Sequence, residues 1–240
     1  MRFDSALINI QNPGKTGVFI LRKIVPLLIL LLLHSYFGCE FCDPDMVVTN
    51  KFFFTRLQYE SGDWDVDQRM PSNLLNSLIE YTTLPVDTQE NIIPLSSPEI
   101  FRCPFCYLSG HKLVEFTRQE QENFEKYVRN GGFVFVDDCN HDIDGLFAKS
   151  FETQMSKIFG PHSLKKISST HPLYSVFFKF DGPPATAQEL NGWGDDIVHD
   201  YLKAIEINGK IGVLYSNKDY GCEWDYDFRN KRFYSIDNTR

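Results

Sequence analysis

The stretch NGGFVFVDDC, residues 130–139, decides the fold class of this chain. Asn130, Gly131 and Gly132 predict the end of a helix, because glycine tolerates the left-handed backbone found after a helix C-terminus. The next four residues are continuously apolar, which is typical of a strand buried on both faces of a parallel sheet. Two aspartates close that strand. The stretch therefore predicts a helix, a buried strand and a polar strand end in succession.

The same alternation continues on both sides of this stretch. Helical spacing of apolar residues predicts helices over residues 71–84, 116–130 and 145–159. β-branched and aromatic runs predict strands over residues 52–61, 86–95, 101–111 and 133–139, and residues 210–224 predict one more strand and a loop. The second helix has the clearest start, with Thr117 as N-cap and Glu120 at the capping-box position.

The helical spacing also predicts which side chains face the core. In the first helix these are Leu74, Leu75, Leu78 and Ile79, and in the second they are Phe124, Tyr127 and Val128. Helices between short apolar strands imply right-handed crossovers and a mostly parallel sheet covered on both faces. We therefore expect a three-layer α/β sandwich with a mostly parallel sheet. Its crevice is expected where the loops 63–67, 109–112 and 137–142 meet, at the carboxyl ends of the strands.

Composition and charge narrow the class of protein. The chain has 240 residues, 42% of them hydrophobic, which is enough for one full-sized core, and we expect a single domain over residues 50–240. The formal net charge is −8, and no basic run follows the N-terminal region. Nucleic-acid binders usually carry a basic stripe. We therefore expect no nucleic-acid partner.

The N-terminal region resembles a targeting segment. Arg22 and Lys23 precede the apolar run 24–33, which has the length of a signal-peptide core and is shorter than a membrane span. Residues 1–39 are therefore expected to be a signal peptide or an N-terminal membrane anchor, and residues 40–49 a short linker. Lipidation at Cys39 is a third alternative. In each case we expect the protein to be exported, and to be either periplasmic or membrane-anchored.

Two cysteines at the start of the third strand admit several interpretations. Cys103 and Cys106 form a Cys-x-x-Cys motif, which can be a redox dithiol, half of a zinc site with Cys39 and Cys42, or a packing pair. A redox dithiol usually opens a helix, whereas this motif enters a strand. The long segment between the two cysteine pairs also disfavours zinc.

Candidate catalytic residues lie at the predicted strand ends. Cys139 stands where a nucleophile elbow would fall, and His111 or His141 would be its base. Asp137 and Asp138 disfavour a thiolate there, because neighbouring negative charges oppose its ionisation. Small residues, which such an elbow needs, are also missing around Cys139.

The same two aspartates admit two other interpretations. With His111, His141, Asp142 and Asp144, they would form a cluster that binds a metal ion. Alternatively, one aspartate caps the next helix and the other holds a neighbouring loop. No cofactor is predicted and no metal site is assigned.

Ligand-binding candidates are Trp64 and Trp224 together with Asp137 and Asp138, because tryptophans often line the rim of a crevice. The alternative is that both tryptophans only cover the core. Cys222 is a candidate neighbour of Cys139. Residues 170–174 (THPLY) predict a turn before a strand, and the loop 182–196 is expected to be a lid or a surface insertion.

The order of several short blocks resembles a known bacterial family. FTRLQYESGDW, PSNLLNSLIEYTTLPV, PF-x-YLSGH, YVRNGGFVFVDDC, THPLY and GVLYSNKDYGCEW are similar to the family called domain of unknown function 4159, over residues 50–227. The resemblance implies a flavodoxin-like fold similar to that of class I glutamine amidotransferases, and a signal peptide or membrane anchor. It also implies that Cys103 and Cys106 stand at packing positions. The alternative, which follows from export, is that these two cysteines form a structural disulfide.

The resemblance supplies no established activity. We expect a noncatalytic binding or assembly module of the bacterial envelope, with envelope proteins as partners and membrane contact through the N-terminal segment. The alternatives are a hydrolase that uses Cys139 with a histidine base, and a metal-dependent enzyme that uses the Asp/His cluster.

Overall fold

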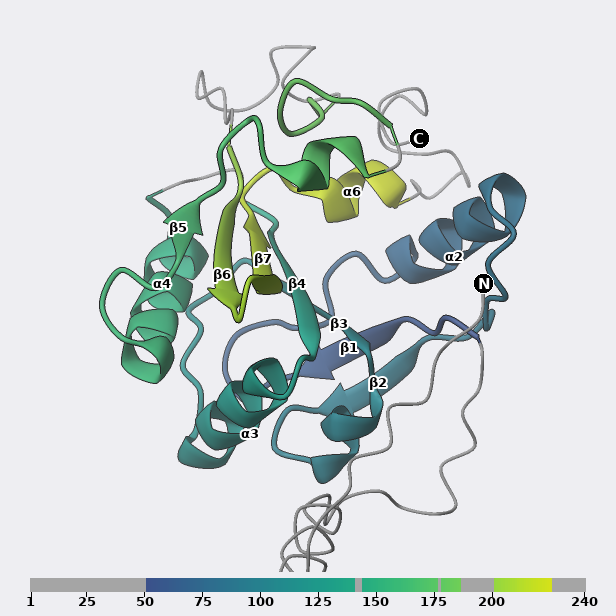
Figure 1. The fold of residues 1–240 in the computed structure, drawn as a ribbon. Helices are drawn as coiled ribbons and strands as arrows, with labels where there is room; N and C mark the ends of the chain where they lie inside the picture. Colours follow the sequence, from purple (N-terminus) through teal and green to yellow (C-terminus); the bar gives the residue numbers. More distant parts are fainter. Residues whose placement is uncertain (1–50, 141–143, 177, 187–200, 226–240) are drawn as a thin grey trace, which may run out of the picture. The chain divides into compact units, whose positions relative to one another are not determined.

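The computed structural model describes residues 51–140, 144–176, 178–186 and 201–225. Within these ranges, seven strands form one sheet in the order β2-β1-β3-β4-β7-β6-β5 (Figure 1). The parallel strands are β2 (Asn91–Pro94), β1 (Thr55–Gln58), β3 (Phe105–Gly110), β4 (Phe133–Asp138) and β7 (Lys210–Ser216). Two antiparallel strands, β6 (Lys203–Ile207) and β5 (Lys165–Lys166), extend the sheet at the β7 edge.

Helices cover both faces of this sheet. The helices α3 (Arg118–Arg129) and α4 (Leu146–Phe159) lie on one face, and α2 (Met70–Tyr81) and α6 (Tyr220–Trp224) lie on the other (Figure 1). Side chains alternate between the faces along each strand. Leu108 and Val136 join the core under α3 and α4, and Tyr107 and Phe135 join the cluster under α2 and α6. The predicted α/β class with a mostly parallel sheet is confirmed.

The helix α3 shows how local sequence fixes this arrangement. Thr117 and Glu120 form the predicted capping box, in which each side chain accepts a hydrogen bond from the backbone N–H of the other residue. Glu120 also accepts a hydrogen bond of 2.8 Å from the N–H of Glu60, which ties the end of β1 to the start of α3. Gly131 has φ of 96°, the left-handed backbone predicted for the end of this helix. The three predicted inward side chains, Phe124, Tyr127 and Val128, are all buried.

Two expectations about local structure are wrong, and two strands were missed. Ile79 is 49% exposed, because it lies in the last turn of α2, beyond the buried residues of the first two turns. Pro172–Ser175 form a short 3₁₀ helix, η2, in place of a turn followed by a strand. The strands β5 and β6 were not expected. The loop 182–196 lies mostly outside the described residues.

Cys103 and Cys106 lie in the main core with free thiols, as the packing interpretation predicts. Cys103 follows the short 3₁₀ helix η1 (Pro98–Arg102), and its backbone carbonyl accepts a hydrogen bond of 2.7 Å from the hydroxyl of Tyr127. Both cysteines therefore help to pack α3 against the start of β3.

Candidate functional site

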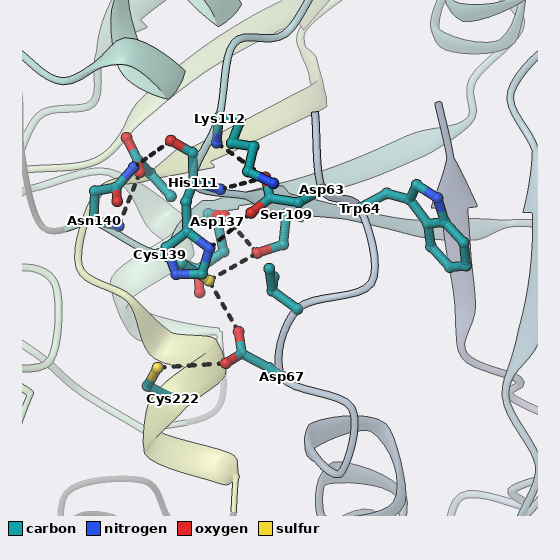
Figure 2. Close-up of polar contacts among 12 residues, drawn as sticks. Asp63, Trp64, Asp67, Ser109, His111, Lys112, Asp137, Cys139, Asn140 and Cys222 are labelled. Atoms are coloured by element: carbon teal, nitrogen blue, oxygen red, sulfur yellow. Dashed lines mark hydrogen bonds and ion pairs between the residues drawn. The ribbon is translucent and has the colours of Figure 1, made fainter. Parts of the chain in front are cut away.

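Polar residues from four strand ends converge at the carboxyl edge of the parallel strands. The loop after β1 contributes Asp67, β3 contributes Ser109 and the end of β4 leads into Cys139. The segment after β7 contributes Asp219 and, in α6, Cys222. Figure 2 shows the Asp67 carboxylate between the two sulfur atoms. The predicted crevice edge is therefore a thiol and carboxylate cluster.

A buried arginine positions the loop that carries Asp67. Arg56 lies in β1, is 2% exposed, and forms an ion pair of 3.1 Å with Glu90. Its guanidinium also donates hydrogen bonds to the backbone carbonyls of Val66, at 2.5 Å, and Asp67, at 3.2 Å. A planar guanidinium with several donors suits such a multiple contact. Arg56 therefore fixes the backbone at Asp67 relative to the sheet.

Cys139 contacts carboxylate and hydroxyl groups. Its Sγ donates a hydrogen bond of 3.0 Å to Oδ2 of Asp67 and lies 3.2 Å from Oγ of Ser109. The hydrogen bond with Cys222, burial, and the negative charges of Asp219 and Asp67 raise the pKa of the Cys139 thiol well above its usual value. Among the described residues, no histidine forms a hydrogen bond with Cys139. The thiol therefore stays protonated near neutral pH.

Asp67 and Cys222 complete the centre of the cluster. Oδ1 of Asp67 accepts a hydrogen bond of 3.4 Å from Sγ of Cys222. Burial raises the pKa of the Asp67 carboxyl. The hydrogen bond with Cys139 opposes the shift at Cys222, but burial and nearby carboxylates raise the pKa of that thiol to about 12. Potential metal ligand atoms of Asp67, Cys139 and Asp219 lie within 4.8 Å of one another.

The two adjacent aspartates of β4 have separate roles. Oδ2 of Asp137 accepts a hydrogen bond of 2.6 Å from the N–H of Gly221, in the first turn of α6. Asp138 points to the opposite face, where it accepts hydrogen bonds from the Tyr215 hydroxyl, at 3.1 Å, and from the N–H of Asn140, at 3.0 Å. Burial raises the pKa of Asp138 to about 6. Neither aspartate caps α4, which begins after Gly145 without a side-chain cap.

Two buried atoms beside this cluster form no hydrogen bond. They are Oδ1 of Asp137 and the hydroxyl of Tyr107. Both side chains are almost completely inaccessible to solvent. Burial, followed by the charge of Asp219, raises the pKa of the Asp137 carboxyl well above its usual range.

The hydrogen bonds of His111 are formed with residues of neighbouring loops. Its Nδ1 is 3.1 Å from Oδ2 of Asp63, and Oδ1 of Asp63 accepts hydrogen bonds of 2.9 Å from the N–H groups of His111 and Lys112. Asn140 donates a hydrogen bond of 2.8 Å to the His111 carbonyl. His111 therefore belongs to a loop-holding network that also contains Asp63.

The remaining sequence candidates that the structure describes do not join the cluster. Trp64 packs against the core under α3 and α4, whereas Trp224, the last residue of α6, packs on the opposite face of the sheet, so they do not form one wall. Figure 2 shows the Trp64 ring directed away from the thiols. Asp144 is exposed, and its Oδ1 lies 3.8 Å from Nζ of Lys149. His141 and Asp142 lie outside the described residues.

Sequence reasoning missed four residues of this site: Asp67, Asp219, Ser109 and Tyr107. Asp67 lies in a loop that was expected at the crevice, but no local motif distinguishes it from Asp63 and Asp65. Asp219 has the positive φ of 54° that aspartate tolerates before a helix, and its side chain caps α6 through the N–H of Cys222. The Asn217 to Asp219 segment after an apolar strand was a usable signal for such a cap.

The described part of the chain contains no helix with the length and apolar character needed to span a bilayer. No curated protein matches the sequence. The family described as "Domain of unknown function (DUF4159)" matches residues 53–240, which is most of the chain. The sequence blocks, the α/β sheet and this match agree, and the chain belongs to the DUF4159 family.

Proposed function

We propose that this protein is an exported or membrane-anchored member of the bacterial envelope whose α/β domain is a noncatalytic binding or assembly module. The observation that carries the proposal is the environment of Cys139. A cysteine nucleophile needs a base or a positive environment that favours the thiolate. Cys139 instead contacts Asp67 and Ser109 in a buried, negatively charged setting.

The alternative of a cysteine hydrolase has little support in this geometry. Backbone N–H groups that would bind an oxyanion are needed beside the nucleophile. Here the N–H of Cys139 is already bonded to the Gly110 carbonyl, at 3.3 Å, and that of Gly221 is bonded to Asp137. His141 lies outside the described residues, so its role as a base remains a prediction.

The reactivity of Cys139 tests this proposal directly. The alkylation rate of each cysteine would be measured by mass spectrometry at pH 7.5, in chelator-treated native protein and in denatured protein. We expect Cys139 to react at least tenfold more slowly in the native protein. Native Cys139 that reacts faster than the denatured reference would overturn the noncatalytic proposal and favour the hydrolase.

Assembly with an envelope protein is supported by an exposed apolar strip after η2. Val176, Phe178 and Phe180 are large apolar side chains that solvent reaches, and Val176 is 76% exposed. Exposed apolar patches often mark protein interfaces. A photo-crosslinking residue at position 178 is expected to give one discrete adduct in intact cells, whereas a crosslinker at the partly exposed Glu125 gives none. Equal labelling at both positions would contradict this assignment.

Export and membrane attachment rest on the N-terminal sequence. The full-length protein is expected in the periplasmic or membrane fraction, and the mass of its mature N-terminus distinguishes cleavage, retention and lipidation. A cytoplasmic full-length chain would overturn this part of the proposal.

A further inference from the structure

We propose that Asp67, Cys139 and Asp219, with Cys222 as the fourth donor, bind a thiophilic divalent cation of the Zn²⁺ type. This inference names the ligand class at the carboxyl edge of the sheet. It rests on the proposed binding function, because it treats Cys139 as a ligand and not as a nucleophile.

The donor geometry fits such an ion. Zn²⁺ binds thiolate sulfur at about 2.3 Å and carboxylate oxygen at about 2.0–2.2 Å, so a tetrahedral site separates its donors by about 3.3–3.8 Å. Oδ2 of Asp67 is 3.0 Å from the Cys139 sulfur, and Oδ1 is 3.4 Å from the Cys222 sulfur. The ligand atoms of Asp67, Cys139 and Asp219 all lie within 4.8 Å of one another. Three donors therefore already lie close to tetrahedral spacing, and the Cys222 sulfur, which contacts Asp67, is the nearest candidate for the fourth position.

A second observation also points to a ligand at this position. The Tyr107 hydroxyl and Oδ1 of Asp137 are buried and form no hydrogen bond. A Cβ atom on Gly221 would lie 2.8 Å from the Tyr107 hydroxyl and would also meet Oδ2 of Asp67. The Tyr107 hydroxyl and Oδ2 of Asp67 therefore border the same space. Buried polar atoms without partners are rare and often adjoin an ion or a water molecule. A water molecule on the bound cation would give the Tyr107 hydroxyl a partner.

Charge supports the same conclusion. Asp67, Asp137 and Asp219 bring three carboxyl groups to this edge, and the buried Lys218 brings one positive charge to the same segment. Burial of several carboxylates together is unfavourable unless cations or protons neutralise them. Binding of a divalent cation to Cys139 and Cys222 would release the two thiol protons to solvent, so the net charge of the site would stay the same, and the carboxylates would gain a cation at bonding distance.

The ligand types determine the class of cation. Thiolate ligands favour Zn²⁺ and related ions, whereas Mg²⁺ and Ca²⁺ prefer sites made only of oxygen atoms. The Arg56 contacts fix the backbone at Asp67, which limits the rearrangement that binding requires. The two partly accessible donors, Asp67 and Cys222, provide the route by which the ion enters.

The experiment uses the full chain, reduced and freed of metal by a chelator. Zn²⁺ is added and its stoichiometry is measured by elemental mass spectrometry after desalting. In parallel, Co²⁺ is added as a spectroscopic probe, because a thiolate on tetrahedral Co²⁺ gives a charge-transfer band and intense visible bands. We expect one Zn²⁺ per chain and a Co²⁺ spectrum with thiolate charge transfer.

Matched variants locate the site. Cys139→Ser and Asp67→Asn are expected to weaken Zn²⁺ binding at least tenfold and to remove or reduce the thiolate band. Cys103→Ala, which removes a thiol at the other end of β3, and Glu125→Gln, which removes a partly exposed carboxylate in α3, are expected to leave both measurements unchanged.

Three results would overturn the metal site. They are the absence of stoichiometric Zn²⁺ from folded reduced protein, a Co²⁺ spectrum without the thiolate band, and binding that survives both ligand substitutions. A Cys139–Cys222 disulfide that persists in reductant and excludes metal would also overturn it. Because alkylation of the metal-free protein is measured separately, a failed metal site is distinguishable from a failed noncatalytic function.

Discussion

The two cysteine pairs near β3 have the same residue type and opposite surroundings. Cys103 and Cys106 lie where β3 begins, within an apolar core. The Cys103 sulfur lies 3.7 Å from the carbonyl oxygen of Glu99, which is a long contact. Cys139 and Cys222 lie beyond the other end of the parallel strands, and both contact the carboxylate of Asp67.

This difference follows from the architecture of a parallel sheet. The loops at the carboxyl ends of the strands meet at one edge, where they bring polar residues from distant parts of the chain together. The start of β3 is instead covered by α3, through the hydrogen bond from Tyr127 to Cys103. A thiol is therefore a packing residue at one end of the strand and a candidate ligand at the other.

The largest expected effect comes from removing the arginine that makes the carboxyl end rigid. Arg56→Met leaves three backbone carbonyls and Glu90 without a buried cationic partner. We expect the free energy of unfolding to fall by about 3 kcal/mol, and the thiolate band of the Co²⁺ complex to weaken because Asp67 is no longer fixed. Urea unfolding and Co²⁺ titration measure both effects.

Arg118→Met is the matched control for that change. Arg118 forms an exposed i,i+4 ion pair with Glu122, so its loss is expected to change the unfolding free energy by less than about 0.5 kcal/mol. Equal effects of the two substitutions would mean that Arg56 has no special role in holding the loop.

The next effect compares one thiol from each pair. Cys106→Ser places a hydroxyl among apolar side chains, and we expect a loss of about 2 kcal/mol in unfolding free energy. Cys139→Ser retains Asp67 and Ser109 as hydrogen-bond partners, so the metal-free protein should lose less than about 0.5 kcal/mol. Urea unfolding of chelator-treated protein checks both values, and the reverse order would contradict the distinction between packing and ligand thiols.

The sequence predicted most of the parallel sheet, because its strands are short apolar runs between clear helix signals. The sharpest case is residues 130–139, where the helix end and β4 appear as predicted. The antiparallel strand β6 was missed, since its sequence KAIEI is short and partly charged. Asn208 and Gly209 both have positive φ, and an Asn-Gly pair between two apolar segments is a strong hairpin signal. The edge of the sheet was therefore predictable in principle.

The candidate site was less predictable than the fold. The positions of Cys139, Asp137 and Asp138 at a strand end follow from local sequence, but their partners depend on tertiary contacts. Arg56 selects Asp67 from an acidic loop by bonding to backbone carbonyls, which leaves no sequence signature. Helical periodicity likewise predicts the face of α2 on which Ile79 lies, but it does not show how far along the helix the packing against the sheet extends.

A smaller effect is expected from Asp137, and it tests whether this buried carboxylate destabilises the metal-free protein. Asp137→Asn removes a buried carboxylate whose Oδ1 has no hydrogen-bond partner and supplies an amide donor in its place. We expect the metal-free protein to gain about 1 kcal/mol in unfolding free energy. The same substitution should weaken Zn²⁺ binding, because it reduces the negative charge at the site. A loss of stability in the metal-free variant would indicate that the hydrogen bond to Gly221 dominates instead.

The smallest effect separates two aspartates within one loop. Burial opposes ionisation of Asp63, but hydrogen bonds from His111 and Lys112 outweigh it and lower the pKa of Asp63, whereas burial raises the pKa of Asp67. Because the folded pKa of Asp63 lies below its unfolded value of about 3.9, its contribution to stability is present above that value. This contribution is lost as the pH falls through the folded pKa. The difference in unfolding free energy between the natural protein and Asp63→Asn should therefore be constant near neutral pH and shrink below about pH 4. Urea unfolding across this pH range measures the difference, and Asp65→Asn, at an exposed neighbour, is the control. A difference that does not change with pH would show that Asp63 acts by shape alone and that ionisation does not distinguish the two aspartates.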